Sequence, residues 1–150
     1  MNASPFILGL ALLTAASAAV AKPVACAPVV EQAWVRAAPP AATTLAAYAV
    51  VRNPCARPFA VTGVASADFA MAMVHETIVE KGVSQMRHAS SLPVPARGSL
   101  VFAPGGKHIM LMHPRRVLKE GDRVRVVLTL ANGEKIAMAA VVQREPPAKR

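Results

Sequence analysis

The chain has 150 residues, 17 of them basic and 8 acidic, which gives a formal net charge of +9 with neutral histidines. This length accommodates one domain with a core of its own. The basic residues are dispersed, and one Trp, one Tyr and four Phe offer little for stacking on bases, so nucleic-acid binding is disfavoured. The charge is consistent with ordinary surface solvation, or with attraction to an acidic partner or an anionic membrane surface.

The first 21 residues are typical of an export signal. Residues 6–21, FILGLALLTAASAAVA, are apolar and end in an A-x-A cleavage pattern, although no Lys or Arg precedes them. The strongly apolar run is shorter than the roughly 20 residues of a membrane span, so we expect cleavage near Ala21 and no transmembrane span in the mature chain. A lipid-modified start at Cys26 is disfavoured, because Pro23 stands where a lipoprotein signal has Leu.

Two cysteines, Cys26 and Cys55, lie beyond this segment. They are too far apart for a CxxC redox or zinc motif, and in an oxidising compartment an isolated pair most often forms a disulfide. We therefore expect a Cys26–Cys55 bond that closes a loop of about 30 residues and contributes roughly 3–4 kcal/mol. The alternative, a pair of metal thiolates, has less support because neither cysteine lies near a His or Met donor in sequence.

Short β-rich segments follow, separated by Pro, Gly and Asn, with no helix of convincing length. The runs typical of strands are 32–36, 45–52, 59–64, 70–79, 83–88, 99–102, 108–112, 123–130 and 135–142. RVRVVLTL (123–130) alternates with period two, and Asn132-Gly133 then signals a hairpin turn. These patterns predict a single antiparallel β-sandwich over residues 22–143, followed by a loose tail over 144–150.

Residues 71–90, MAMVHETIVEKGVSQMRHAS, predict a hairpin that turns at residues 81–82. With a two-residue loop, His75 pairs with His88, so Met86 lies on the same face as His75 at a diagonal position about 7–8 Å away. A three-residue loop would instead turn Met86 to the opposite face.

The stretch KHIMLM, which begins at residue 107, carries the same two types of donor. In an extended chain, Ile109 and Leu111 share one face, and His108, Met110 and Met112 share the other. Either the second face is also packed, or its imidazole and thioethers are presented to a ligand.

Thioether and neutral imidazole are soft donors that suit Cu(I) better than magnesium or calcium, and zinc would normally require Cys or carboxylate as well. Taken singly, each Met has the simpler explanation of core filling, and each His that of a structural residue. The spacing of four donors is more specific. His75, Met86, His108 and Met110 form the pattern H-x10-M-x21-H-x-M.

This pattern resembles the PCuAC family of periplasmic copper chaperones, which are associated with copper supply to cytochrome oxidase. The similarity spans about residues 31 to 142 and includes AWVR (33–36), EKG (80–82), PGG (104–106), HIMLM (108–112) and LKEGD (118–122).

The resemblance implies a cupredoxin-like Greek-key β-sandwich without catalytic residues, in the periplasm. It also implies delivery of copper to a protein client, such as the CuA centre of cytochrome c oxidase or an assembly factor of that enzyme. The Cu(I) ligands that it implies are His75, Met86, His108 and Met110. Further donors occur nearby, for which we expect core packing or surface exposure: Met71, Met73, His88, Met112 and His113.

Other functions stay open at this point. Copper sequestration for resistance would use the same site and differ only in the destination of the ion, and a structural or adhesive sandwich would need no metal. A copper enzyme or blue-copper electron carrier is disfavoured, because such a site needs a Cys with two His, and neither cysteine has a His or Met in ligand register. No nucleophile-elbow sequence is present, which leaves a hydrolase with little support.

Overall fold

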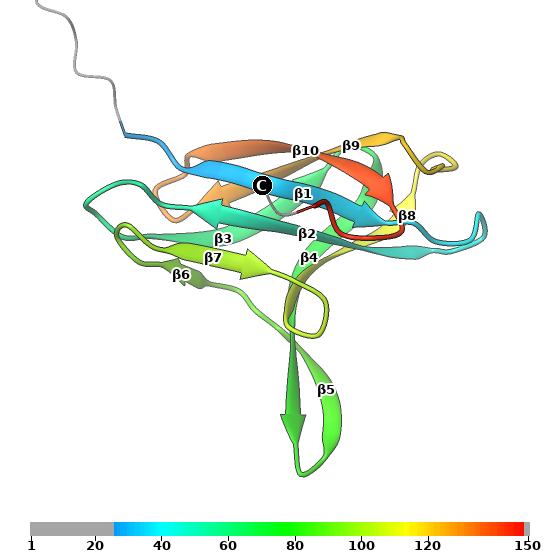
Figure 1. Ribbon diagram of the computed structural model, residues 1–150, viewed down its shortest axis with the longest axis horizontal. Helices are drawn as coiled ribbons and strands as arrows, with labels where there is room; N and C mark the ends of the chain where they lie inside the picture. The colour runs from blue at the N-terminus through cyan, green and yellow to red at the C-terminus, as the bar shows by residue number, and fades with distance from the viewer. Residues whose placement is uncertain (1–25, 149–150) are drawn as a thin grey trace, which may run out of the picture.

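The computed structural model describes residues 26–148, so the predicted signal peptide over residues 1–21 lies outside the described residues. Ten strands make up the fold (Figure 1): β1 Val29–Arg36, β2 Thr44–Arg52, β3 Phe59–Ser66, β4 Phe69–Glu80, β5 Val83–His88, β6 Leu92–Val94, β7 Ser99–Phe102, β8 Lys107–Pro114, β9 Arg123–Leu130 and β10 Lys135–Gln143. Nine of them match the predicted runs to within three residues at either end, and β6 is the addition. Within residues 26–148, no helix has the length and apolar character needed to cross a membrane.

The predicted all-β sandwich is confirmed. Hydrogen bonds connect the strands in the order β5-β4-β8-β2-β1-β10-β9-β3-β6, with β7 also paired to β2. This path folds back on itself, because β3 contacts β4 and β6 contacts β7, and two layers result (Figure 1). All the pairings are antiparallel except that of β1 with β10, which lie at the two ends of the domain's sequence.

The core lies between the layers and is built mainly from aliphatic side chains at alternate strand positions. In β9, Val124, Val126 and Leu128 are fully buried while Arg123 and Arg125 are exposed, as the period-two pattern predicts. Ile109 and Leu111 of β8 are also fully buried, so one face of KHIMLM is part of the core. The other face of β8 must therefore lie on the outer side of its layer.

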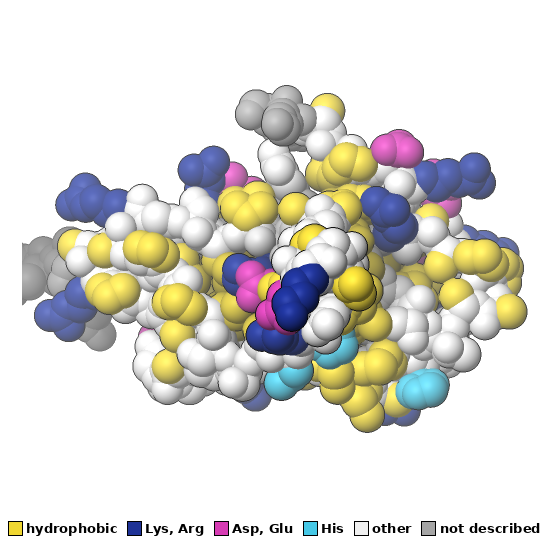
Figure 2. Space-filling view, turned by 90° about the horizontal axis from the view of Figure 1, so that it is seen from below, with side chains coloured by type: hydrophobic (Ala, Val, Ile, Leu, Met, Phe, Trp, Pro, Cys, Tyr) yellow, Lys and Arg dark blue, Asp and Glu magenta, His cyan; other side chains and the backbone are white. Residues whose placement is uncertain are grey.

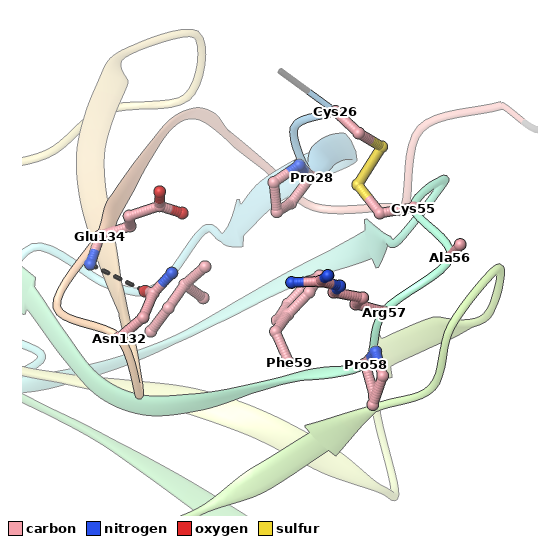
Figure 3. Close-up of a pocket in the computed structure, with 10 residues that line it drawn as sticks. Cys26, Pro28, Cys55, Ala56, Arg57, Pro58, Phe59, Asn132 and Glu134 are labelled. Atoms are coloured by element: carbon pink, nitrogen blue, oxygen red, sulfur yellow. Dashed lines mark hydrogen bonds between the residues drawn. A yellow bond between two sulfur atoms is a disulfide. The ribbon is translucent and has the colours of Figure 1, made fainter.

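The predicted disulfide is present between Cys26, just before β1, and Cys55, just after β2, with a Cα–Cα distance of 5.6 Å (Figure 3). It extends the β1–β2 pair beyond its last rung, Val29–Arg52. The loop that carries Cys55 is held by the buried Asn53. Its side-chain amide donates to the carbonyl groups of Arg57 and Pro95, both at 2.9 Å, and its oxygen accepts from the Cys55 N–H at 3.0 Å.

The β4–β5 hairpin projects from the body of the sandwich (Figure 1). β4 has 12 residues. Residues 69–76 of β4 pair with β8 on one side, and residues 75–80 pair with β5 on the other. Every residue of β5 is exposed, and β5 is an edge strand whose only neighbour in the sheet order of the described residues is β4.

Candidate metal centre

The turn at residues 81–82 sets the register of the hairpin. Lys81 and Gly82 both have positive φ, 52° and 79°, which is the geometry of a two-residue turn matched to the strand twist. His75 consequently pairs with His88, and Thr77 pairs with Met86. The predicted two-residue loop is confirmed, and Met86 shares a face with His75.

β8 brings a second set of donors to the other side of β4. His75 is directly opposite His108, Met73 opposite Met110, and Met71 opposite Met112. Residues directly opposite in an antiparallel pair share a face. One outer face thus collects donors from three adjacent strands: Met86 and His88 of β5, Met71, Met73 and His75 of β4, and His108, Met110 and Met112 of β8.

His108 has a defined orientation and tautomer. It is 5% exposed, and its Nδ1 lies 2.9 Å from the carbonyl oxygen of Gly106. A carbonyl oxygen can only accept, so Nδ1 carries the hydrogen and Nε2 keeps the lone pair that a metal requires. The Gly106 carbonyl also accepts the Thr77 N–H, at 3.2 Å. The turn before it contains Gly105 at a φ of 78°, a conformation suited to glycine.

His75 lies between the other two histidines of its row. Its ring centroid is 6.1 Å from that of His108 and 6.0 Å from that of His88. Its Nδ1 is buried without a hydrogen-bond partner among the described residues. Burial first, and then electrostatic repulsion by His108 and His88, lower the pKa of His75, which favours the neutral ring.

The spacing of these rings fits a shared ion. With metal–nitrogen bonds of about 2.0 Å, two imidazoles on one ion have centroids roughly 5–6 Å apart. His75 and His108 are close to the upper end of that range at 6.1 Å. The centroid distance of His75 and His108 is therefore compatible with both rings binding one cation.

Two methionines flank this pair of histidines. Met86 lies two residues nearer the hairpin turn, on β5, and is 63% exposed. Met110 lies two residues further from that turn, on β8, and is half-buried. His75 is directly opposite His108 and diagonal to both methionines, so it is the member of the predicted set that neighbours the other three.

The carboxylates nearest to this face are paired with basic side chains. Glu76, next to His75 in sequence, forms an ion pair with Lys107 at 2.6 Å, and Glu80 forms one with Arg87 at 2.7 Å. In the described part of the chain, no group of three or more His, Cys, Asp or Glu is placed to hold a metal ion. The other donors beside the histidines on this face are thioethers, which suit soft cations such as Cu(I).

The face is an exposed surface at the base of the projecting hairpin, where histidines border hydrophobic side chains (Figure 2). It is distinct from the hollow beside the disulfide, whose lining includes Cys26, Arg57, Phe59 and Asn132 but no His or Met (Figure 3).

The spacing of His and Met identified the four donors, and strand alternation placed Met112 beside Met110 and His88 opposite His75, but no local pattern placed Met71 and Met73. The structure brings Met71, Met73, His88 and Met112 to the same face. His113 differs, because it is exposed and its φ of 53° breaks the alternation of β8 after Met112.

Comparison with known proteins gives the family. A family model described as "Putative lipoprotein LpqE-like" matches residues 29–142. The chain belongs to the LpqE-like family, which is of the PCuAC type. The "Putative lipoprotein Lxx21020" of Leifsonia xyli subsp. xyli is 35% identical over 115 residues, which are 76% of this chain and 68% of that protein.

Solved structures confirm the PCuAC fold. Apo-DR1885 from Deinococcus radiodurans has a TM-score of 0.64 and 30% identity over 97% of both chains, and CuI-DR1885 has 0.61 and 32% over 77% of both. The copper-bound PCuAC domain from PmoF2 has a TM-score of 0.65 at 24% identity, covering 79% of this chain and 93% of that domain.

The names of these relatives bear on Cys26. A lipoprotein carries its lipid on a cysteine sulfur, but in this chain the sulfur of Cys26 is bonded to Cys55. One sulfur cannot form a lipid thioether and a disulfide at the same time, so the disulfide-bonded Cys26 has no free thiol to carry a lipid.

Proposed function

We propose that this protein is an exported copper chaperone that binds one Cu(I) through His75, Met86, His108 and Met110 and passes it to a protein client. The observation that carries the proposal is the pair of facing histidines, one with a buried unpartnered nitrogen and the other with its lone pair directed by a backbone carbonyl, flanked by two thioethers.

Relatives with the same fold support this choice of ion. The names of CuI-DR1885 and of the copper-bound PmoF2 domain record copper in those proteins. The donor set of this chain is soft and lacks a thiolate, because both cysteines are joined in the disulfide. Such a set binds Cu(I) and still releases it by ligand exchange.

The exposure of the site favours delivery over storage. Met86 is 63% exposed on a projecting edge strand, so a donor from a partner can approach the ion as Met86 leaves it. We propose the CuA centre of cytochrome c oxidase, or an assembly factor of that enzyme, as the client, and the periplasm as the compartment, reached after cleavage of the signal near Ala21.

The test has two parts. Anaerobic titration with Cu(I) against a competing chelator should give one tightly bound ion with nitrogen and sulfur in its coordination shell, and the Met86→Leu/Met110→Leu variant should bind it more weakly. Undiminished affinity in that variant would overturn the ligand assignment. Transfer is then tested by mixing the loaded protein with an apo CuA domain and measuring copper in each after chromatographic separation. Retention of all copper by the loaded protein would favour sequestration.

A further inference from the structure

Three methionines on the donor face have no role in the proposed ligand set. These are Met71, Met73 and Met112. A methionine that fills a core is buried, as Met138 is at 4% exposure. Met71 is 49% exposed, and Met73 and Met112 are half-buried on the outer face of their layer. Core packing therefore does not account for them.

The three residues form a compact triangle on two paired strands. Met71 is directly opposite Met112, and Met73 is two residues further along β4. Directly opposite Cβ atoms are about 4.5–5.5 Å apart and diagonal ones about 7–8 Å, both within reach of long side chains. Three flexible thioethers at these positions can converge on one ion.

The residues that the strand register places around the triangle offer no free carboxylate as a competing hard ligand. On β2, the residues opposite Met112 and Met110 are Thr44 and Ala46, both small. The rung beyond Met71 holds Phe69 and Pro114, which carry no donor. The nearby carboxylate of Asp68 is engaged by Arg116 at 3.2 Å.

We propose that Met71, Met73 and Met112 form a second site, made of thioethers alone, for a soft monovalent cation. The identity of the cation as Cu(I) rests on the proposed function, whereas the site itself rests on the geometry of β4 and β8. Because Met73 is directly opposite Met110, an ion moves between the two sites by exchanging one ligand at a time. Copper–sulfur bonds to Met71, Met73 and Met112 break as bonds to the sulfurs and imidazole nitrogens of the first site form, and the oxidation state of the ion does not change.

Stoichiometry tests the proposal. The purified protein is titrated anaerobically with Cu(I), kept reduced by ascorbate, against a weak competing chelator. Wild type should bind two ions, one tight and one weaker. The M71L/M73L/M112L variant should bind only the tight ion, with an affinity within about threefold of wild type, since Met→Leu conserves volume. The matched control Met138→Leu should bind both. A single ion in wild type with nitrogen in its coordination shell, or two ions in the triple variant, would refute the second site.

A second measurement does not depend on folding of the triple variant. In wild type with labelled methionine methyl groups, those of Met86 and Met110 should shift with the first equivalent of Cu(I). The methyl groups of Met71, Met73 and Met112 should shift with the second, while that of the buried Met138 stays in place. If the three methyl groups do not respond to the second equivalent, the proposal is wrong.

The two proposals fail in different ways. A His75→Ala/Met86→Leu variant should lose the tight ion but keep one weaker ion that has sulfur alone in its shell and an affinity unchanged from pH 5 to 8, because thioethers do not titrate in this range. Nitrogen in that shell would refute a site of thioethers alone. If wild type showed only this sulfur-bound ion, the second site would stand and the proposed chaperone site would not.

Discussion

Removal of the disulfide should separate the stability of the fold from its affinity for copper. The Cys26→Ser/Cys55→Ser variant opens a loop whose ends are 29 residues apart. The chain-entropy relation for a loop of about this length gives roughly 12 cal/mol/K, or about 3.6 kcal/mol at 25 °C. That is a factor of about 400 in the ratio of folded to unfolded protein, and a domain of this size should lose roughly 10–15 °C in Tm.

The assay is urea unfolding of wild type and of the double variant, together with Cu(I) competition titrations of both. Wild type reduced with a phosphine serves as the matched control for the unfolding measurement, because it lacks the bond but keeps both sulfurs. Cu(I) affinity should be unchanged, since the bond joins the segments beside β1 and β2 whereas the donors lie on β4, β5 and β8. A loss of less than about 1 kcal/mol would refute the loop-closure reasoning. A fall in copper affinity would show that the bond supports the metal site.

Three further predictions concern single side chains. Met86→Leu should change the free energy of unfolding by less than about 0.5 kcal/mol, because the side chain is 63% exposed, yet lower Cu(I) affinity; equal affinity in a competition titration would exclude it as a ligand. Cu(I) affinity should fall between pH 8 and 5, because His75 and His108 ligate only when neutral, and the lowered pKa of His75 moves its share of the loss to a pH below the ordinary 6.5. A profile that is flat after correction for the chelator would remove both histidines. Asn53→Ala should cost about 2–4 kcal/mol in urea unfolding, because three hydrogen bonds of about 1 kcal/mol each are lost at a buried position; a loss below about 1 kcal/mol would show that water replaces them.

Local patterns in the sequence were sufficient for most of the strands. Period-two alternation over 123–130 reproduces β9 to the residue, and Asn132-Gly133 marks the turn into β10. β6 was missed because Leu92–Val94 is three residues long and contains a proline, so it shows no periodicity. The parallel pairing of β1 with β10 joins segments about 100 residues apart, for which no local pattern exists.

The four proposed ligands were found by the spacing of His and Met, and the soft chemistry of the set is a property of the side chains themselves. The sequence by itself thus determined most of the strands, the disulfide partners and the donor types, because these depend on composition and local order. Only the tertiary structure brought the donors of the hairpin and those of β8 onto one face, since that depends on the pairing of β4 with β8. The lone pair of His108 likewise depends on a carbonyl placed by the Gly105–Gly106 turn, and the exposure of Met71 on how the layers pack.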